Sequence, residues 1–132
     1  MNATMAEQTK AEHLHARLAE IDLATVHVVC TERSIGRKFQ AALTRQLFAK
    51  LGIRGISVTA PNYSMAQSIE VILPKREDFT LHSLADYMND PARVANHQAR
   101  EKVQAIIARA FPNHDDRSNG QTDHYDFKWS IS

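Results

Sequence analysis

The chain has 132 residues, of which 43% are apolar and 23% charged, with 16 Lys and Arg against 15 Asp and Glu. These proportions are ordinary for one globular domain with one core, and they exclude a chain that is disordered throughout. No apolar run approaches the ~20 residues that a bilayer-spanning helix needs, and a single cysteine excludes an intrachain disulfide. We expect a cytoplasmic protein without a membrane partner, with a disordered N-terminus at residues 1–10 and a single α+β domain at residues 11–132.

The charges are segregated along the chain. The segment from Arg33 to Ile69 holds six basic side chains and no Asp or Glu. The six are Arg33, Arg37, Lys38, Arg45, Lys50 and Arg54. A nearly neutral protein with one basic region has a polarised surface, which prefers an anionic partner.

Two elements are predicted before this basic region. Leu14, Leu18 and Ile21 recur at helical spacing, which predicts a surface helix from about residue 10. The β-branched run at residues 26–30 is either a buried strand or the first turns of the next helix. We favour the strand because β-branched side chains pack well on a pleated sheet.

The strongest helical pattern covers residues 34–51. Thr31 or Ser34 offers an N-cap, and Gly52 follows as a C-cap residue that is free to adopt positive φ. The apolar residues that recur every four positions are Ile35, Phe39, Leu43, Leu47 and Leu51. This pattern predicts an amphipathic helix with basic residues interleaved among its apolar ones.

A β-hairpin is predicted next, with strands at residues 56–60 and 68–73 and a loop at residues 61–67. Apolar and polar side chains alternate in the first strand, and Ile69, Val71 and Leu73 share one face of the second. Pro61 ends the first strand and Pro74 ends the second, because proline has no N–H group to donate to the ladder.

The C-terminal half contains helices and a last strand. Residues 83–88 suggest one or two helical turns, and Asp90 followed by Pro91 starts a helix that runs to about Ala110. Residues 113–121 are polar and are predicted to be a loop. Aromatic residues then alternate with polar ones over residues 124–131, which predicts a half-buried strand carrying Tyr125, Phe127, Trp129 and Ile131.

Two architectures fit this order of elements. If residues 26–30 form a strand, the core is a ferredoxin-like βαββαβ with an extra N-terminal helix. If they do not, it is a three-stranded antiparallel sheet with helices on one face. Both are two-layer α+β folds, and neither selects a function.

The basic helix and the hairpin loop are the leading candidate for a contact surface. Phosphate groups need exposed, convergent Lys or Arg side chains, which Arg33 and Arg37 offer because they lie one turn apart. Asn62 and Tyr63 in the hairpin loop add groups that bond to or stack on bases. The competing interpretation is that these charges only solvate the outer face of a helix.

The acidic stretch at residues 115–126 has oxygen ligands and a glycine at calcium-loop spacing, but Arg117 stands at the third ligand position and opposes binding. A speculative metal site would combine His114, Asp116, Asp123 and His124. A solvated turn is the favoured interpretation, and no cofactor is expected.

Cys30 is close in sequence to His27 and Glu32. A catalytic cysteine needs a lowered pKa, but a lone cysteine that ends an apolar run usually acts as a small hydrophobe. We therefore expect a non-enzymatic chain.

Two stretches, at residues 35–73 and 113–126, carry short motifs within a helix–hairpin–strand order. They are Leu51-Gly52, Ile56-Ser57-Val58, Tyr63-Ser64-Met65, Ser68-Ile69-Glu70-Val71 and Thr122-Asp123-His124-Tyr125. With these motifs the chain resembles a small α+β module found in large polyvalent proteins of phages and conjugative elements, and it departs from that pattern after Leu73. The resemblance implies a mobile-element context, with DNA handling or interference with host defences as the roles.

The sequence thus predicts a binding module that contacts nucleic acid or a nucleoprotein through the basic helix and the hairpin loop. A protein–protein inhibitor or adaptor of the counter-defence type, also able to form a homodimer, is the second hypothesis. A metal-dependent enzyme that uses the loop at residues 114–126 is the third.

Overall fold

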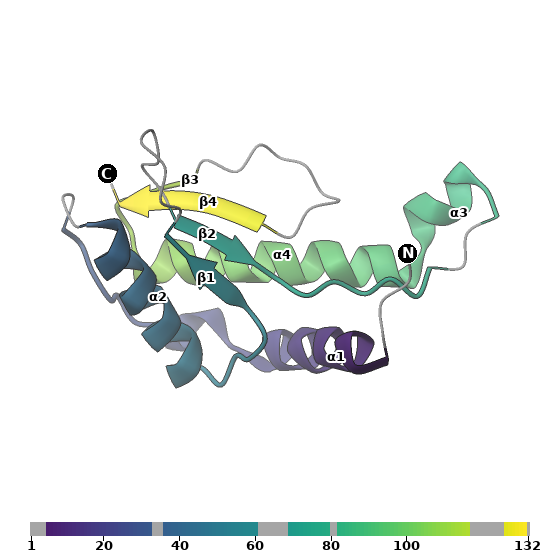
Figure 1. The fold of residues 1–132 in the computed structure, drawn as a ribbon, viewed down its shortest axis with the longest axis horizontal. Helices are drawn as coiled ribbons and strands as arrows, with labels where there is room; N and C mark the ends of the chain where they lie inside the picture. Colours follow the sequence, from purple (N-terminus) through teal and green to yellow (C-terminus); the bar gives the residue numbers. More distant parts are fainter. Residues whose placement is uncertain (1–4, 33–35, 61–68, 80–81, 117–125, 132) are drawn as a thin grey trace.

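The computed structural model describes residues 5–32, 36–60, 69–79, 82–116 and 126–131. In these ranges the elements are α1 (Met5–Glu20), η1 (Leu23–Thr25), α2 (Arg37–Lys50), β1 (Ser57–Thr59), β2 (Ile69–Ile72), α3 (Leu84–Asn89), α4 (Pro91–Ala110), β3 (His114–Asp116) and β4 (Asp126–Ile131) (Figure 1). This mixture of helices and an antiparallel sheet confirms the α+β class.

The strands lie in the order β1-β2-β4-β3, and each described pair is antiparallel. Val71 of β2 is opposite Val58 on one side and Phe127 on the other. The predicted hairpin and the predicted C-terminal strand are therefore confirmed as strands. The hairpin loop at residues 61–67 and Tyr125 lie outside the described residues.

The favoured strand at residues 26–30 is wrong. In the described part of the chain this run has no strand partner, and the N–H groups of Val29 and Cys30 instead donate to the Ala110 carbonyl at 2.7 and 3.3 Å. The carbonyl at the end of α4 thus accepts hydrogen bonds that the carbonyls of a neighbouring strand would otherwise accept. Without that strand, the ferredoxin-like order is not confirmed.

The strand β3 lies inside the segment that was predicted to be a polar loop. Its register places Asp116 opposite Trp129 and His114 opposite Ile131. Backbone pairing with β4 creates this strand, and its polar side chains give no sign of it in the sequence.

The helix starts differ from the predictions at α1 and α2. The helix α1 begins at Met5, so residues 5–10 of the predicted disordered stretch are helical. The N-cap of α2 is Gly36, which makes no side-chain capping bond, so the predicted cap at Thr31 is wrong, and Ser34 lies outside the described residues.

The two C-terminal helices begin as the sequence predicts. Ser83 caps α3 by accepting from the Asp86 N–H at 3.2 Å, and Asp90 caps α4 by accepting from the Ala92 N–H at 2.8 Å. Asn96 of α4 also accepts from the Arg76 N–H and donates to the Arg76 carbonyl, which fixes the chain after β2 against this helix.

The buried face of α2 only partly overlaps the apolar stripe that the sequence predicts. Its buried residues are Gln40, Ala41, Thr44, Leu47 and Phe48. Phe39 is 54% exposed, and Leu43 and Leu51 are half-buried. Because α2 packs on β1, β2 and β4 through the face that holds Thr44 and Leu47, Phe39 is left largely outside the core.

The core joins the helices to the sheet. Val103 and Ile106 of α4 are fully buried in one cluster with Ile69 and Val71 of β2 and with Leu14 of α1. Figure 1 shows α4 running behind the sheet and α1 running below α4. The predicted buried face of α4 is confirmed.

His15 lies where α1 packs on α4. Neither ring nitrogen has a hydrogen-bond partner in the described chain, and a cavity of about 260 Å³ beside it is also lined by Leu18 of α1 and by Ala99 and Lys102 of α4. Burial, and next the positive charge of Arg76, lower the pKa of His15 to about 4, although Asp78 acts in the opposite direction. The folded protein therefore holds His15 neutral at pH 7.

The free energy of unfolding is expected to fall as the pH is lowered from about 6.5 to about 4, because the unfolded His15 takes up a proton that the folded one refuses. The substitution His15→Leu removes this part of the pH dependence. It is also expected to stabilise the protein at pH 7 by about 1 kcal/mol, since it removes two buried polar atoms without partners.

Urea unfolding at several pH values measures both effects. His82→Leu is the matched control, because it makes the same substitution at an exposed histidine. A pH dependence of His15→Leu equal to that of the parent protein would contradict this role of His15.

Candidate anion-binding site

The predicted contact residues that the structure describes are spread along α2 and the turn after it. Arg33, Asn62 and Tyr63 lie outside the described residues. Lys38 is exposed near the start of α2 and Lys50 is exposed at its end, so they are separated by about 18 Å at 1.5 Å per residue. Arg37 is half-buried at the first residue of α2.

Arg45 has a structural partner. Its Nε and Nη2 donate to the Val58 carbonyl at 3.2 and 2.6 Å. The strand β1 is at the end of the sheet order, so this guanidinium ties α2 to the edge strand. These two bonds give Arg45 a structural role, and its service as an anion contact stays a prediction.

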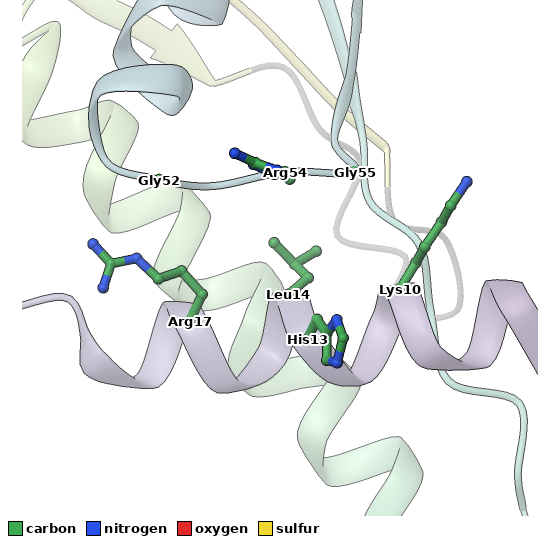
Figure 2. A pocket seen from close by; sticks show the side chains of 7 residues that line it. All are labelled: Lys10, His13, Leu14, Arg17, Gly52, Arg54 and Gly55. Atoms are coloured by element: carbon green, nitrogen blue, oxygen red, sulfur yellow. The ribbon is translucent and has the colours of Figure 1, made fainter.

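Arg54 belongs to a pocket that the sequence analysis did not anticipate. The pocket has a volume of about 320 Å³ and lies between α1 and the turn that joins α2 to β1 (Figure 2). Its lining residues are Lys10, His13, Leu14, Arg17, Gly52, Arg54 and Gly55. Two parts of the chain about 40 residues apart in sequence thus bring three permanent cations together.

The pocket is positively charged. Among the side chains that the structure describes, no acidic one lines it. Within the described chain, Lys10 and Arg54 make no hydrogen bond or ion pair, and both are exposed. Figure 2 shows Leu14 pointing from α1 toward the turn, with Lys10 extending from α1 and Arg54 from the turn in different directions. Because these two side chains do not aim at one point, they suit an anion with several separated oxygens.

Arg17 joins the two sides of the pocket. Its Nε and Nη2 donate to the Leu51 carbonyl at 2.9 and 2.7 Å, and its Nη1 is 3.4 Å from Glu20. Leu51 is the C-cap of α2, where the helix leaves carbonyls without intrahelical partners and carries a partial negative charge. The guanidinium therefore satisfies the end of α2 from α1.

Gly52 makes this approach possible. It has φ of +72°, and its N–H donates to the Ala49 carbonyl while the Ile53 N–H donates to the Phe48 carbonyl. This pair of bonds is the Schellman motif that ends many helices at glycine. A Cβ at Gly52 would lie 3.3 Å from the Arg17 Nε, so the glycine provides both the backbone conformation and the space.

The speculative metal residues divide between two parts of the chain. His114 and Asp116 lie in β3, whereas Asp123 and His124 lie outside the described residues. Among the described residues, no group of three or more His, Cys, Asp or Glu is placed to hold a metal ion. Asp115 and Asp116 pair with β4, so the first part of the suggested calcium loop is a strand.

The spacing of the α1 residues that line the pocket is visible in the sequence. Lys10, Leu14 and Arg17 are spaced four and three residues apart, which places them on one helix face. The helix was predicted from its apolar residues alone, and the predicted cations all belong to the basic region that begins at Arg33. The contact between α1 and Gly52 is long-range, and no local pattern predicts it.

Comparison with known proteins adds no relative: no family model, curated protein or solved structure matches the chain. Among the described residues, no helix is long and apolar enough to cross a membrane.

Because Arg17 lies close to Gly52, substitutions at these two residues are expected to have coupled effects on the free energy of unfolding. Gly52→Ala is expected to lower the free energy of unfolding by about 1–2 kcal/mol, because an alanine is strained at positive φ and its Cβ crowds Arg17. The same change is expected to cost less in an Arg17→Met background, where the crowded Nε is absent. Urea unfolding of the four proteins gives the coupling as a double-mutant cycle.

Gly55→Ala is the control for this cycle. Gly55 also has positive φ, of +90°, but a Cβ there would meet Pro74 at an ordinary distance of 3.6 Å. Its cost is expected to be the same in the parent protein and in the Arg17→Met background. An equal cost of Gly52→Ala in both backgrounds would show that Arg17 does not depend on the glycine.

Proposed function

We propose that this chain is a non-enzymatic binding module that holds a phosphate-bearing polymer, and that nucleic acid is this polymer. The observation that carries the proposal is the pocket of Lys10, Arg17 and Arg54, which has no acidic residue among its described lining residues. Nucleic acid presents repeated, separated phosphate oxygens, which suit cations that do not converge on one point.

The balance of charge at the pocket favours an anion. The C-terminal end of α2 contributes about half a negative charge, and Arg17 already bonds to the carbonyl that carries part of it. Lys10 and Arg54 add two full positive charges without partners in the described chain. The net field in the pocket is thus positive, and each phosphate held there would release counterions.

Two-layer packing is the architecture that we propose for this module. Alternate residues support it: Val58, Ile69 and Val71 are buried, whereas Ser57 and Ile72 are exposed. This is the pattern of an antiparallel sheet with its helices on one face. A cytoplasmic location and a mobile-element origin stay predictions from the sequence.

A protein adaptor is the second candidate function. The observation in its favour is the helix α3, which stands away from the sheet in Figure 1 and carries Leu84 and Met88 at 77% and 50% exposure. An apolar interface there would respond weakly to salt, whereas phosphate contacts lose affinity steeply as salt is added. Salt response therefore distinguishes the two functions.

The leading proposal predicts that random single-stranded oligonucleotides bind and that the double variant Lys10→Glu with Arg54→Glu loses most of the affinity. It also predicts that the slope of log K against log salt becomes shallower by about 1–1.5, at about 0.7 for each phosphate that the protein no longer neutralises. Fluorescence anisotropy at several salt concentrations measures the affinity and the slope.

The single variants Lys10→Glu and Arg54→Glu are measured as well, and Lys38→Glu is their matched control, because it makes the same change of charge as each of them on an exposed lysine at the other end of α2. Its effect is expected to be small. If Lys38→Glu weakened binding as much as either pocket substitution, net charge rather than the pocket would account for the affinity. Unchanged binding by the double variant would refute the proposal.

A further inference from the structure

The pocket between α1 and the turn after α2 has an aromatic ring at its rim that the fold does not use. His13 lines the pocket and is exposed. Along α1 it lies between Lys10 and Arg17, beside Leu14 (Figure 2). Within the described chain, its ring makes no hydrogen bond or ion pair. The imidazole is therefore available to a ligand that lies in the pocket.

The side of the pocket formed by the turn leaves room for such a ligand at Gly55. At Gly52 the space is taken, because Arg17 lies 3.3 Å from the position of an added Cβ. A Cβ at Gly55 would meet Pro74 at 3.6 Å, and no described atom of α1 lies within 4 Å of it. Glycine also lets a ligand come close to the backbone. The exposed turn at Gly55 can therefore serve as one wall for a flat group.

The other surfaces of the pocket are partly apolar. Leu14 is 2% exposed and lies between α1 and the turn. The alkyl stems of Lys10 and Arg17 add apolar area beneath their charged ends. The pocket thus offers an apolar base with cations around it, which suits a ligand with a flat ring attached to anionic groups.

The size of the pocket limits what part of a nucleic acid can enter. Its volume of about 320 Å³ is at the lower end of the range for cavities that hold small molecules. It therefore suits one planar ring system and not a double helix. Bases in a duplex stay inside the stack unless they are extruded, whereas unpaired bases can be splayed out and stacked on aromatic side chains, histidine included.

We propose, as an extension that rests on the proposed function, that the pocket takes one unpaired base of a single-stranded nucleic acid. The base stacks on His13, which is the one aromatic side chain among the described lining residues. Lys10 and Arg54 hold the phosphates on either side of it. Every base has a face that can stack, so the site selects single strands and tolerates any sequence.

Two labelled ligands of equal charge test the base site by fluorescence anisotropy. One is a random single-stranded oligonucleotide of about 12 nucleotides, within the usual range of site sizes. The other has the same length and the same phosphates, but each base is replaced by hydrogen. The parent protein is expected to bind the strand with bases at least about fivefold more tightly, which corresponds to one base stacked on an aromatic ring.

Variants of His13 test the position of the base. His13→Ala is expected to bring the two affinities together by weakening only the binding of the strand with bases. His13→Phe is expected to keep the difference, because phenylalanine retains a flat ring. Both changes are at an exposed position of α1 and leave the core intact. His82→Ala is the matched control, because it removes an exposed histidine that does not line the pocket.

The outcomes separate this inference from the function on which it rests. Equal affinity of the parent protein for both ligands, lost with the Lys10→Glu and Arg54→Glu changes, would overturn the base site and leave the proposed function standing. A difference that survives His13→Ala would place the base elsewhere and would also overturn it. If neither ligand bound in a salt-sensitive way, the proposed function itself would fail.

Discussion

The bond between the Arg17 guanidinium and the Leu51 carbonyl is the contact on which the rest of this molecule depends. The Schellman motif at the end of α2 pairs the carbonyls of Phe48 and Ala49 and leaves the one at Leu51 for a side chain. Because α1 supplies that side chain, Arg17, the bond holds α1 against the turn after α2. The same contact places Leu14 in the core and Lys10 at the rim of the pocket.

A second constraint comes from how α2 sits on the sheet. Its buried face includes Gln40 and Thr44, and the Gln40 Oε1 is buried without a partner in the described chain. Arg45 reaches from the flank of this face to the edge strand. Because the buried face of α2 contains these polar residues, part of its apolar stripe stays exposed to solvent, as at Phe39. The helix has therefore been placed by contacts with the strands and not by its own hydrophobic stripe alone.

The sequence was sufficient where local chemistry decides the structure. Asp90 followed by Pro91 predicted the start of α4, and alternation predicted β2 and β4. It failed where a distant partner decides. The run at residues 26–30 is anchored by Ala110, and β3 exists because β4 lies next to it. The pocket depends on a contact between residues 34 positions apart, so only its separate cations were visible in the sequence.

The most direct measurement is a titration of the isotope-labelled protein with a short random single-stranded oligonucleotide, followed by amide chemical shifts. The account predicts that shifts concentrate on Lys10, His13 and Arg17 of α1 and on the turn from Gly52 to Gly55, and that they weaken as salt is added. Shifts centred instead on α3 or on the start of α2, or no shifts at low salt, would contradict the claim that this pocket is where the protein meets its anionic partner.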